Sequence, residues 1–325
     1  MENTTRDSRA EHRPSARLDE VKRRMVRQKL IERGVELLVY LSSWVSILGI
    51  IFLFIFIGKE AFPLLFDPRM KAEVQLSQLW ASIWQPVSDM PKFGLIPLFI
   101  GTLKVSLVAM LFATPLAILA AIFTSEFAPP RLGRAIKPTV ELLAGIPSVV
   151  LGFFALVVLA TYVQDAFGLI MRLNATVAGI ALGIAVLPII YTITEDALAT
   201  VPKSFREASL SLGATPWQTA YKVVLPAALP GIFAALVLGF GRAVGETMIV
   251  LMASGNASIV SVSLGDSTRT LSATIAAELA EVVFGDGHYR LLFGLGVILF
   301  SFTFILNLFG SWYIQRVKKR LMGAA

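Results

Sequence analysis

The strongest constraint on the fold is a series of long apolar runs. A helix needs about 20 mostly apolar residues to cross a bilayer, and in lipid it must satisfy its own backbone hydrogen bonds. The runs cover residues 37–58, 105–125, 142–164, 173–194, 223–253 and 291–315, with only Arg242 and Glu246 interrupting the fifth. The sequence therefore predicts an all-α polytopic membrane protein with six transmembrane helices.

The composition agrees with a membrane protein and excludes several kinds of site. Hydrophobic residues make up 56% of the chain and charged residues 16%, whereas soluble domains have about 45–50% and about 25%. The chain has no cysteine, which excludes disulfides, iron–sulfur clusters and a cysteine nucleophile. Its two histidines, His12 and His288, are too few for a multi-histidine metal site. We expect no metal and no cofactor.

Basic residues predict the topology. Ten Lys and Arg precede residue 34, and ten more lie between the second and third runs, between the fourth and fifth, and after the sixth. The opposite loops hold seven. Cytoplasmic segments carry the excess of Lys and Arg, so both termini are expected in the cytoplasm, as six spans also require. The first run is too long for a signal peptide and is expected to be retained.

The basic tail, residues 1–34, is expected to be partly disordered. Residues 1–20 are rich in Arg, Glu, Ser and Thr, a composition that buries little apolar surface. The tail has no interleaved aromatic residues and adjoins a span, so we interpret it as a topology signal that contacts anionic lipid. Nucleic acid is not an expected partner.

A short cytoplasmic hairpin is predicted before the fifth run. A helix is expected after Pro202 with Ser204 as its N-cap, and Gly213 is expected to end it. Thr215 can begin a second short helix, and Leu225-Pro226 is expected to mark entry into the membrane. Such an element could dock in a groove on a soluble partner, or it could be an ordinary interfacial helix.

This segment resembles the EAA motif of ABC importer permeases. That motif consists of Glu-Ala-Ala, three residues, Gly, nine residues and Ile-x-Leu-Pro. Here Glu207-Ala208-Ser209 is followed by Gly213 and then by residues 223–226, Val-Val-Leu-Pro, at the same spacing. The resemblance implies a type I importer fold, MetI-like, in which this loop contacts a separate ATPase. It assigns that contact to Glu207, Ala208, Ser209, Gly213, Leu225 and Pro226.

A second constellation lies within the fifth run. Arg242 and Glu246 are four residues apart and would share one face of a continuous helix, where they can pair. Charges at this depth usually face a bundle interior or a water-filled path. We expect a gate or an anion-contacting site at Arg242 and Glu246, with Gly245 allowing close packing or bending. The alternative is an ion pair that only fixes helix packing.

A third feature lies at the start of the third run. Gly145 and Pro147 are expected to loosen or kink that helix, which would turn the hydroxyl of Ser148 toward the pathway. The alternative is a kink used only for packing. The second run can be extended back to Phe93 if it includes Lys104, whose ammonium group is then expected to extend toward the outer interface.

Together these segments resemble one branch of the ABC permeases. GIPSVVLGFFAL at residues 145–156, the EAA-like loop, and GRAVGETM at residues 241–248 are similar to the PstC-type permease of phosphate importers. The resemblance covers residues 35–320, with a core at about 95–315 and a coupling loop at 195–224. It implies a multi-pass protein of the bacterial cytoplasmic (inner) membrane that forms half of a phosphate pathway.

The same resemblance implies the partners. They are a second, PstA-like permease, a PstB-like ATPase dimer, a PstS-like phosphate-binding protein, phosphate and membrane lipid. The chain has no G-x-x-x-x-G-K-[ST] sequence, the phosphate-binding loop of many ATPases, so ATP hydrolysis is expected on another chain.

Three other functions are weighed against this one. The permease could carry another oxyanion, molybdate or sulfate, or the chain could act as a phosphate-sensing signalling component. A membrane enzyme would have to use Glu195, Asp196 or Glu246, and the sequence offers these carboxylates no nucleophile or metal partner. We therefore expect a permease without catalytic residues.

Overall fold

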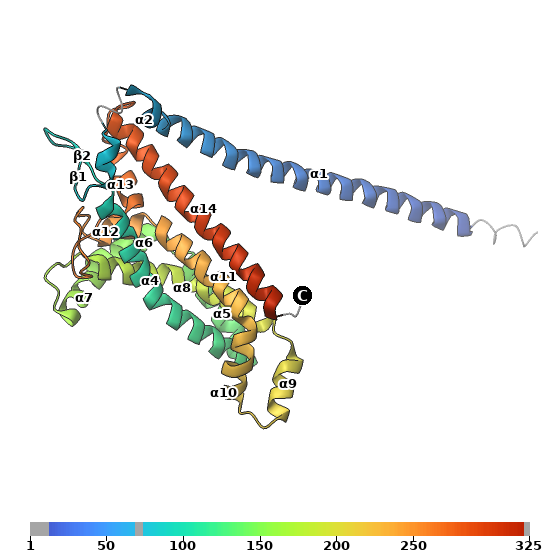
Figure 1. Cartoon of the computed structure of the whole chain (residues 1–325). Helices are drawn as coiled ribbons and strands as arrows, with labels where there is room; N and C mark the ends of the chain where they lie inside the picture. The colour runs from blue at the N-terminus through green and yellow to red at the C-terminus, as the bar shows by residue number, and fades with distance from the viewer. Residues whose placement is uncertain (1–12, 69–73, 322–325) are drawn as a thin grey trace, which may run out of the picture. The chain divides into compact units, whose positions relative to one another are not determined.

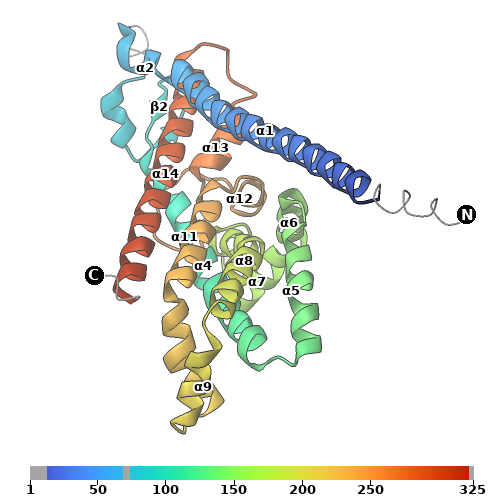
Figure 2. The ribbon, with the colours of Figure 1, turned by 90° about the vertical axis from the view of Figure 1, so that its right-hand side faces the viewer.

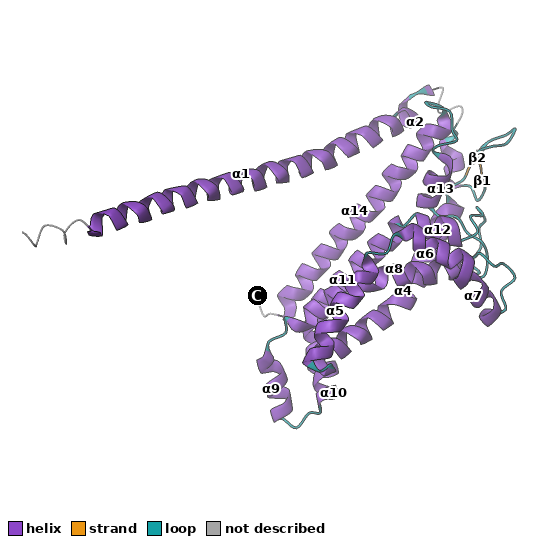
Figure 3. Ribbon diagram, turned by 180° about the vertical axis from the view of Figure 1, so that it is seen from behind, coloured by secondary structure: helices purple, strands orange, loops and turns teal. Residues whose placement is uncertain are grey.

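The computed structural model describes residues 13–68 and 74–321, and helices dominate that part of the chain (Figure 3). Six of the described helices are long and apolar enough to cross a membrane. The prediction of an all-α chain with six spans is confirmed. The chain divides into two compact units, residues 1–57 and 58–325, which are described separately.

The first unit consists mainly of α1 (Arg13–Ala61), a helix of 49 residues. It includes the first predicted span and begins well before that span. Residues 13–34 of the basic tail are helical, because Lys, Arg, Glu, Leu and Met favour the helix and the apolar run continues it. Residues 1–12 lie outside the described residues.

Two helices form the centre of the second unit (Figure 1). They are α4 (Ile96–Ile122), which continues as the π-helical turn η2 (Phe123–Phe127), and α8 (Ala175–Ala199). A Cβ on Gly179 would lie 2.4 Å from Val108 Cγ1, and one on Gly183 would lie 2.8 Å from Phe112 Cδ1. Only glycine permits this approach, as expected where helices pack through small residues.

The third predicted span is divided. Helix α5 (Pro130–Ala144) ends at Gly145, and α6 (Ser148–Phe154) begins after Pro147. The span continues through η3 (Ala155–Leu159) and α7 (Ala160–Phe167). The candidate span begins at residue 148, not at 142 as predicted, because Pro147 adopts an extended backbone that separates two helices instead of kinking one.

The fifth span is also divided. It begins with α10 (Pro216–Thr219), passes through η4 (Ala220–Val224) and continues as α11 (Leu225–Gly245). The short α12 (Met248–Ala253) follows a two-residue break. Helix α11 packs against α8 and against α14 (Gly287–Leu321), which carries the sixth span.

A hydrophobic cluster separate from the α4–α8 core lies at one end of the second unit. It includes the β-hairpin of β1 (Trp84–Gln85) and β2 (Lys92–Phe93), in which Trp84 pairs with Phe93. Around it lie α2 (Pro63–Phe66), η1 (Leu76–Trp80) and α13 (Leu271–Glu278). Helix α9 (Lys203–Ser211) and α10 project from the opposite end (Figures 1 and 2).

Candidate functional sites

The α9–α10 hairpin follows the predicted outline with one correction. Helix α9 begins at Lys203 with Pro202 as its N-cap, so Ser204 lies inside the helix and is not the cap. Pro202 has an extended backbone, with ψ 140°, that ends the preceding segment. Gly213 has φ +82°, a left-handed conformation that stops a helix, as predicted. Thr215 begins α10 through a capping box with Gln218.

The EAA-like residues occupy both accessible and internal positions. Glu207, Ala208 and Gly213 are exposed. The Oγ of Ser209 lies 2.9 Å from Thr219 Oγ1 and joins α9 to α10, a contact that alanine could not make.

Leu225 and Pro226, which are predicted to mark entry into the membrane, do not begin the helical segment that carries the fifth span. They lie within a continuous helical segment that starts at Pro216. Proline removes one i→i−4 hydrogen bond, and the π turn η4 changes the hydrogen-bond register directly before Pro226.

Three large apolar side chains of the hairpin are exposed. Phe205 is 49% exposed, Leu212 89% and Trp217 55%. Trp217 also contacts two other rings, with its centroid 6.0 Å from Phe127 in η2 and 6.4 Å from Tyr221. Clustered exposed apolar side chains of this size mark interaction sites more often than plain surface. The hairpin is therefore a candidate docking surface.

Arg206 anchors the hairpin to the bundle, a role that the sequence did not predict. Its Nε and Nη2 donate to the two carboxylate oxygens of Glu126 at 2.9 and 2.6 Å. Its Nη1 donates to the carbonyl of Val201 at 2.6 Å, and its Nη2 to that of Leu198 at 3.0 Å. The hydrogen bonds to Glu126 raise the pKa of Arg206. No local pattern predicts a pair that is 80 residues apart in sequence.

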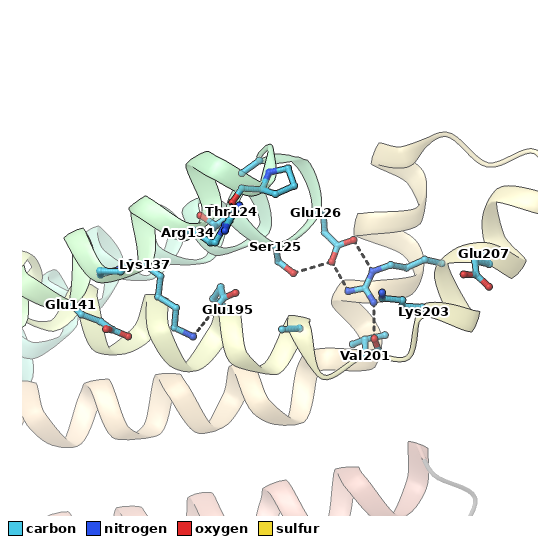
Figure 4. A pocket seen from close by; sticks show the side chains of 16 residues that line it. Thr124, Ser125, Glu126, Arg134, Lys137, Glu141, Glu195, Val201, Lys203 and Glu207 are labelled. Carbon is cyan, nitrogen blue, oxygen red and sulfur yellow. Dashed lines mark hydrogen bonds and ion pairs between the residues drawn. The ribbon is translucent and has the colours of Figure 1, made fainter.

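An open pocket of about 1010 Å³, lined by several charged side chains, lies between η2, α5, the end of α8 and α9 (Figure 4). On one side Lys137 of α5 binds Glu195 at 2.7 Å and also binds Asp196. Hydrogen bonds to Asp196 and Glu195 raise the pKa of Lys137. Glu195 and Asp196, which a membrane enzyme would have needed, therefore tie α5 to α8. Glu207 lines the same pocket.

Arg242 and Glu246 do not form the predicted pair. Helix α11 ends at Gly245, and Glu246 has an extended backbone with ψ 132°, so the two residues no longer share a helical face. No ion pair joins them within residues 13–68 and 74–321. Glu246 Oε1 instead accepts a hydrogen bond from the amide of Thr247 at 3.2 Å, and its carbonyl accepts one from Ser272 Oγ at 2.8 Å.

Arg242 nevertheless lies about halfway along the length of the bundle. A Cβ on Gly239 would lie 2.8 Å from Ile190 Cγ1 and 3.2 Å from Val186 Cγ1, and both residues are near the midpoint of α8. Arg242 lies less than one turn further along α11, and its side chain is exposed. An arginine at the bilayer centre costs at least about 2.5–3.5 kcal/mol, which disfavours a lipid-facing position.

Gly245 ends α11 directly before the break at residues 246–247, and Ser148 lies on α6, which packs against the segment after that break. Gly245 is exposed and lines an open pocket of about 460 Å³ with Thr247 and Ser272. Ser148 begins α6, which packs against α12. The structure thus brings the motif at residues 145–156 next to the segment that follows the motif at 241–248.

Lys104, which was expected to extend its ammonium group toward the outer interface, reaches the loop at residues 254–270 and is buried there. Its residue is 8% exposed, and its Nζ donates to the carbonyls of Ser261 and Ser263 at 3.1 and 3.0 Å. The loop at residues 254–270 supplies these carbonyls, so Lys104 joins α4 to this loop. The carbonyls satisfy an ammonium group that would otherwise have to reach water.

Comparisons with known proteins agree with this architecture. Residues 113–322 match the family described as binding-protein-dependent transport system inner membrane component. A probable ABC transporter permease protein, YqgH, of Bacillus subtilis is 40% identical, over 69% of this chain and 73% of that protein. The phosphate transport system permease protein PstC of Mesorhizobium japonicum is 39% identical, over 75% of this chain and 80% of that protein.

Solved structures show the same fold. The chain is similar to a bacterial alginate ABC transporter in complex with its periplasmic protein, with a TM-score of 0.58 and 18% identity over 85% of this chain and 94% of the other. It is also similar to the inward-facing methionine transporter MetNI, with a TM-score of 0.52 and 20% identity over 68% and 96%. The chain therefore belongs to the binding-protein-dependent transport system inner membrane components and is a multi-pass permease subunit of an ABC importer.

Proposed function

We propose that this permease carries inorganic phosphate, with both termini in the cytoplasm. Residues 35–320 form half of the translocation pathway, and residues 1–34 form a basic cytoplasmic tail. The similarity to PstC at 39% identity supports phosphate as the substrate. The excess of Lys and Arg at the termini and around α9 supports the orientation.

The exposed apolar surface on α9 and α10 is the observation that carries the proposal. This surface projects from one end of the bundle (Figure 2) and contains the motif with Glu207, Ala208, Ser209 and Gly213. A PstB-like ATPase dimer docks there, and ATP-driven movement of α9 changes the access of the pathway. Leu225 and Pro226 continue this segment into α11 and transmit the movement along one helix.

Arg242 supplies positive potential to the pathway. It is an exposed cation in the last turn of α11, three residues after Gly239, which packs against the midpoint of α8. A PstA-like permease covers this face, so that Arg242 faces a water-filled path between the two subunits. Glu246, Gly245 and Ser148 line the same path at the break between α11 and α12.

Substrate selection begins outside the membrane. A PstS-like binding protein delivers phosphate to the outer end of the bundle, where the β-hairpin and α13 lie. Arg242 alone does not separate phosphate from other oxyanions, because a single charge recognises each of them. The proposal therefore assigns most of the specificity to the binding protein.

ATP-dependent uptake of labelled phosphate by the reconstituted four-component complex tests this function. We expect uptake that requires ATP and the phosphate-binding protein, and that excess molybdate or sulfate leaves unchanged. Uptake of molybdate or sulfate in place of phosphate would show another oxyanion importer. A transcriptional response to phosphate without any uptake would show a signalling component.

A further inference from the structure

One guanidinium group connects three elements at the base of the bundle. Arg206 lies on α9, Glu126 on the π turn η2 that ends α4, and the carbonyls of Leu198 and Val201 at the end of α8. Four of the five N–H donors of an arginine are engaged in this way. No other basic side chain in the described part of α9 makes an ion pair.

The pair is built for rigidity. Glu126 and Arg206 meet through two parallel N–H···O bonds, a bidentate geometry that fixes orientation as well as distance. The side chain of Glu126 is 10% exposed and that of Arg206 is 22% exposed, so salt screens the pair less than a surface pair. Ser125 Oγ also donates to Glu126 Oε1 at 3.1 Å and holds the carboxylate in place.

A second contact joins the same two regions. The ring of Trp217 in α10 lies 6.0 Å from that of Phe127, the neighbour of Glu126 in η2. The hydroxyls of Ser209 and Thr219 join α9 to α10. Helices α9 and α10 therefore contact the end of α4 on both sides of the hairpin turn.

We propose that Arg206 is a positioning residue that holds α9 and the end of α4 together as one moving body. Displacement of α9 by the ATPase then reaches α4 directly, as well as through the continuous helix of the fifth span. Helix α4 in turn carries Lys104, which binds the carbonyls of Ser261 and Ser263 at the far end of the bundle. This inference rests on the proposed coupling of α9 to an ATPase.

The test compares Glu126→Gln, Arg206→Gln, Arg206→Lys and the double Gln variant in the reconstituted complex. Three quantities are measured: retention of the ATPase during purification, ATP hydrolysis, and phosphate transported per ATP hydrolysed. Each single Gln variant should keep its ATPase and lose about tenfold in phosphate per ATP, the size of a typical coupling between sites. Arg206→Lys keeps the positive charge and loses the bidentate contact with Glu126. Its phosphate transported per ATP should lie between the values for wild type and Arg206→Gln.

The double variant tests whether the two residues act as a unit. If they do, the double Gln variant loses no more phosphate per ATP than the worse single variant. Multiplied losses in the double variant would contradict the proposal, and so would an unchanged ratio in Glu126→Gln. Loss of the ATPase during purification of Glu126→Gln would also contradict it, because Glu126 would then act in docking or folding.

Lys137→Gln is the matched control. It removes an ion pair that lines the same pocket and joins α5 to α8 without touching α9. Its phosphate per ATP should equal that of wild type, and an equal loss in this control would contradict a specific role for Arg206. A wild-type complex that retains no ATPase, or that transports no phosphate, would instead overturn the proposed function.

Discussion

Gly152 of α6 packs directly against Met252 of α12. A Cβ on Gly152 would lie 3.0 Å from Met252 Sδ, 3.1 Å from the carbonyl oxygen of Met248 and 3.2 Å from the Cα of Ile249. Two of these three atoms belong to the backbone, which cannot move aside like a side chain. The glycine therefore sets the spacing between α6 and the segment that follows Glu246.

Larger side chains at position 152 should separate these two helices. Gly152→Val should lower stability by about 1–3 kcal/mol through overpacking and should reduce phosphate uptake, as measured by thermal unfolding in detergent and by transport. Gly152→Ala should cost less, because alanine favours the helix by about 1 kcal/mol. Gly133→Val is the control, since its nearest neighbour is 3.7 Å away. If Gly152→Val and Gly133→Val lowered stability and uptake equally, the close contact at Gly152 would be refuted.

Lys104 should hold the loop at residues 254–270 to α4. Lys104→Met leaves the carbonyls of Ser261 and Ser263 without their charged donor, and such hydrogen bonds contribute about 1.5–3 kcal/mol each. We expect a lower unfolding temperature and faster proteolysis of this loop. Lys92→Met, at an exposed position of β2, should change neither. Unchanged proteolysis in Lys104→Met would contradict the assignment.

The ion pairs of Lys137 with Glu195 and Asp196 predict that the protein loses stability at alkaline pH. The pKa of Lys137 is raised in the folded protein by Asp196 and Glu195, so its contribution is fully present below the unfolded pKa of about 10.4. The contribution is lost as pH rises above that value toward the folded pKa. Wild type should unfold at a higher temperature than Lys137→Met. This difference in unfolding temperature should be constant near neutral pH and should shrink above about pH 10.4. A difference that grows in alkali would exclude this pair as the cause.

Arg242 and Glu246 should differ in their effects on transport. Arg242→Gln removes an exposed positive charge from α11 and should lower phosphate uptake about tenfold, within the usual range for one interacting site, whereas Arg242→Lys should retain most of it. Glu246→Gln should have the smaller effect, because this carboxylate does not pair with Arg242. Phosphate uptake by the Arg242 and Glu246 variants, measured at equal amounts of permease in the membrane, checks both predictions. Wild-type uptake in Arg242→Gln would remove Arg242 from the pathway.

The sequence predicts those features of the fold that depend on residues close together in the chain. Apolar runs give six spans because burial in lipid needs length and apolarity, and Gly213 and Thr215 mark the turn between α9 and α10 because their backbone roles are local. The Arg242–Glu246 pair was predicted from helical spacing, which holds only while a helix continues, and the helix ends at Gly245.

Tertiary contacts account for what sequence reasoning missed. The bond between Arg206 and Glu126 joins segments 80 residues apart, and the bonds of Lys104 to residues 261 and 263 span more than 150. Hydropathy placed Lys104 within a span and gave no sign that a loop folds back to satisfy it. Pro147 was expected to bend a helix and instead separates two.

Single cysteines at two exposed sites test the central claim most directly. The natural chain has no cysteine, Leu212 beside Gly213 is 89% exposed, and Val87 at the hairpin tip is 91% exposed. In intact cells, Leu212→Cys should cross-link to the nucleotide-hydrolysing subunit and resist a membrane-impermeant maleimide, whereas Val87→Cys should react with that maleimide from outside. Labelling of Leu212→Cys from outside, or its failure to cross-link in a transporting complex, would contradict the account.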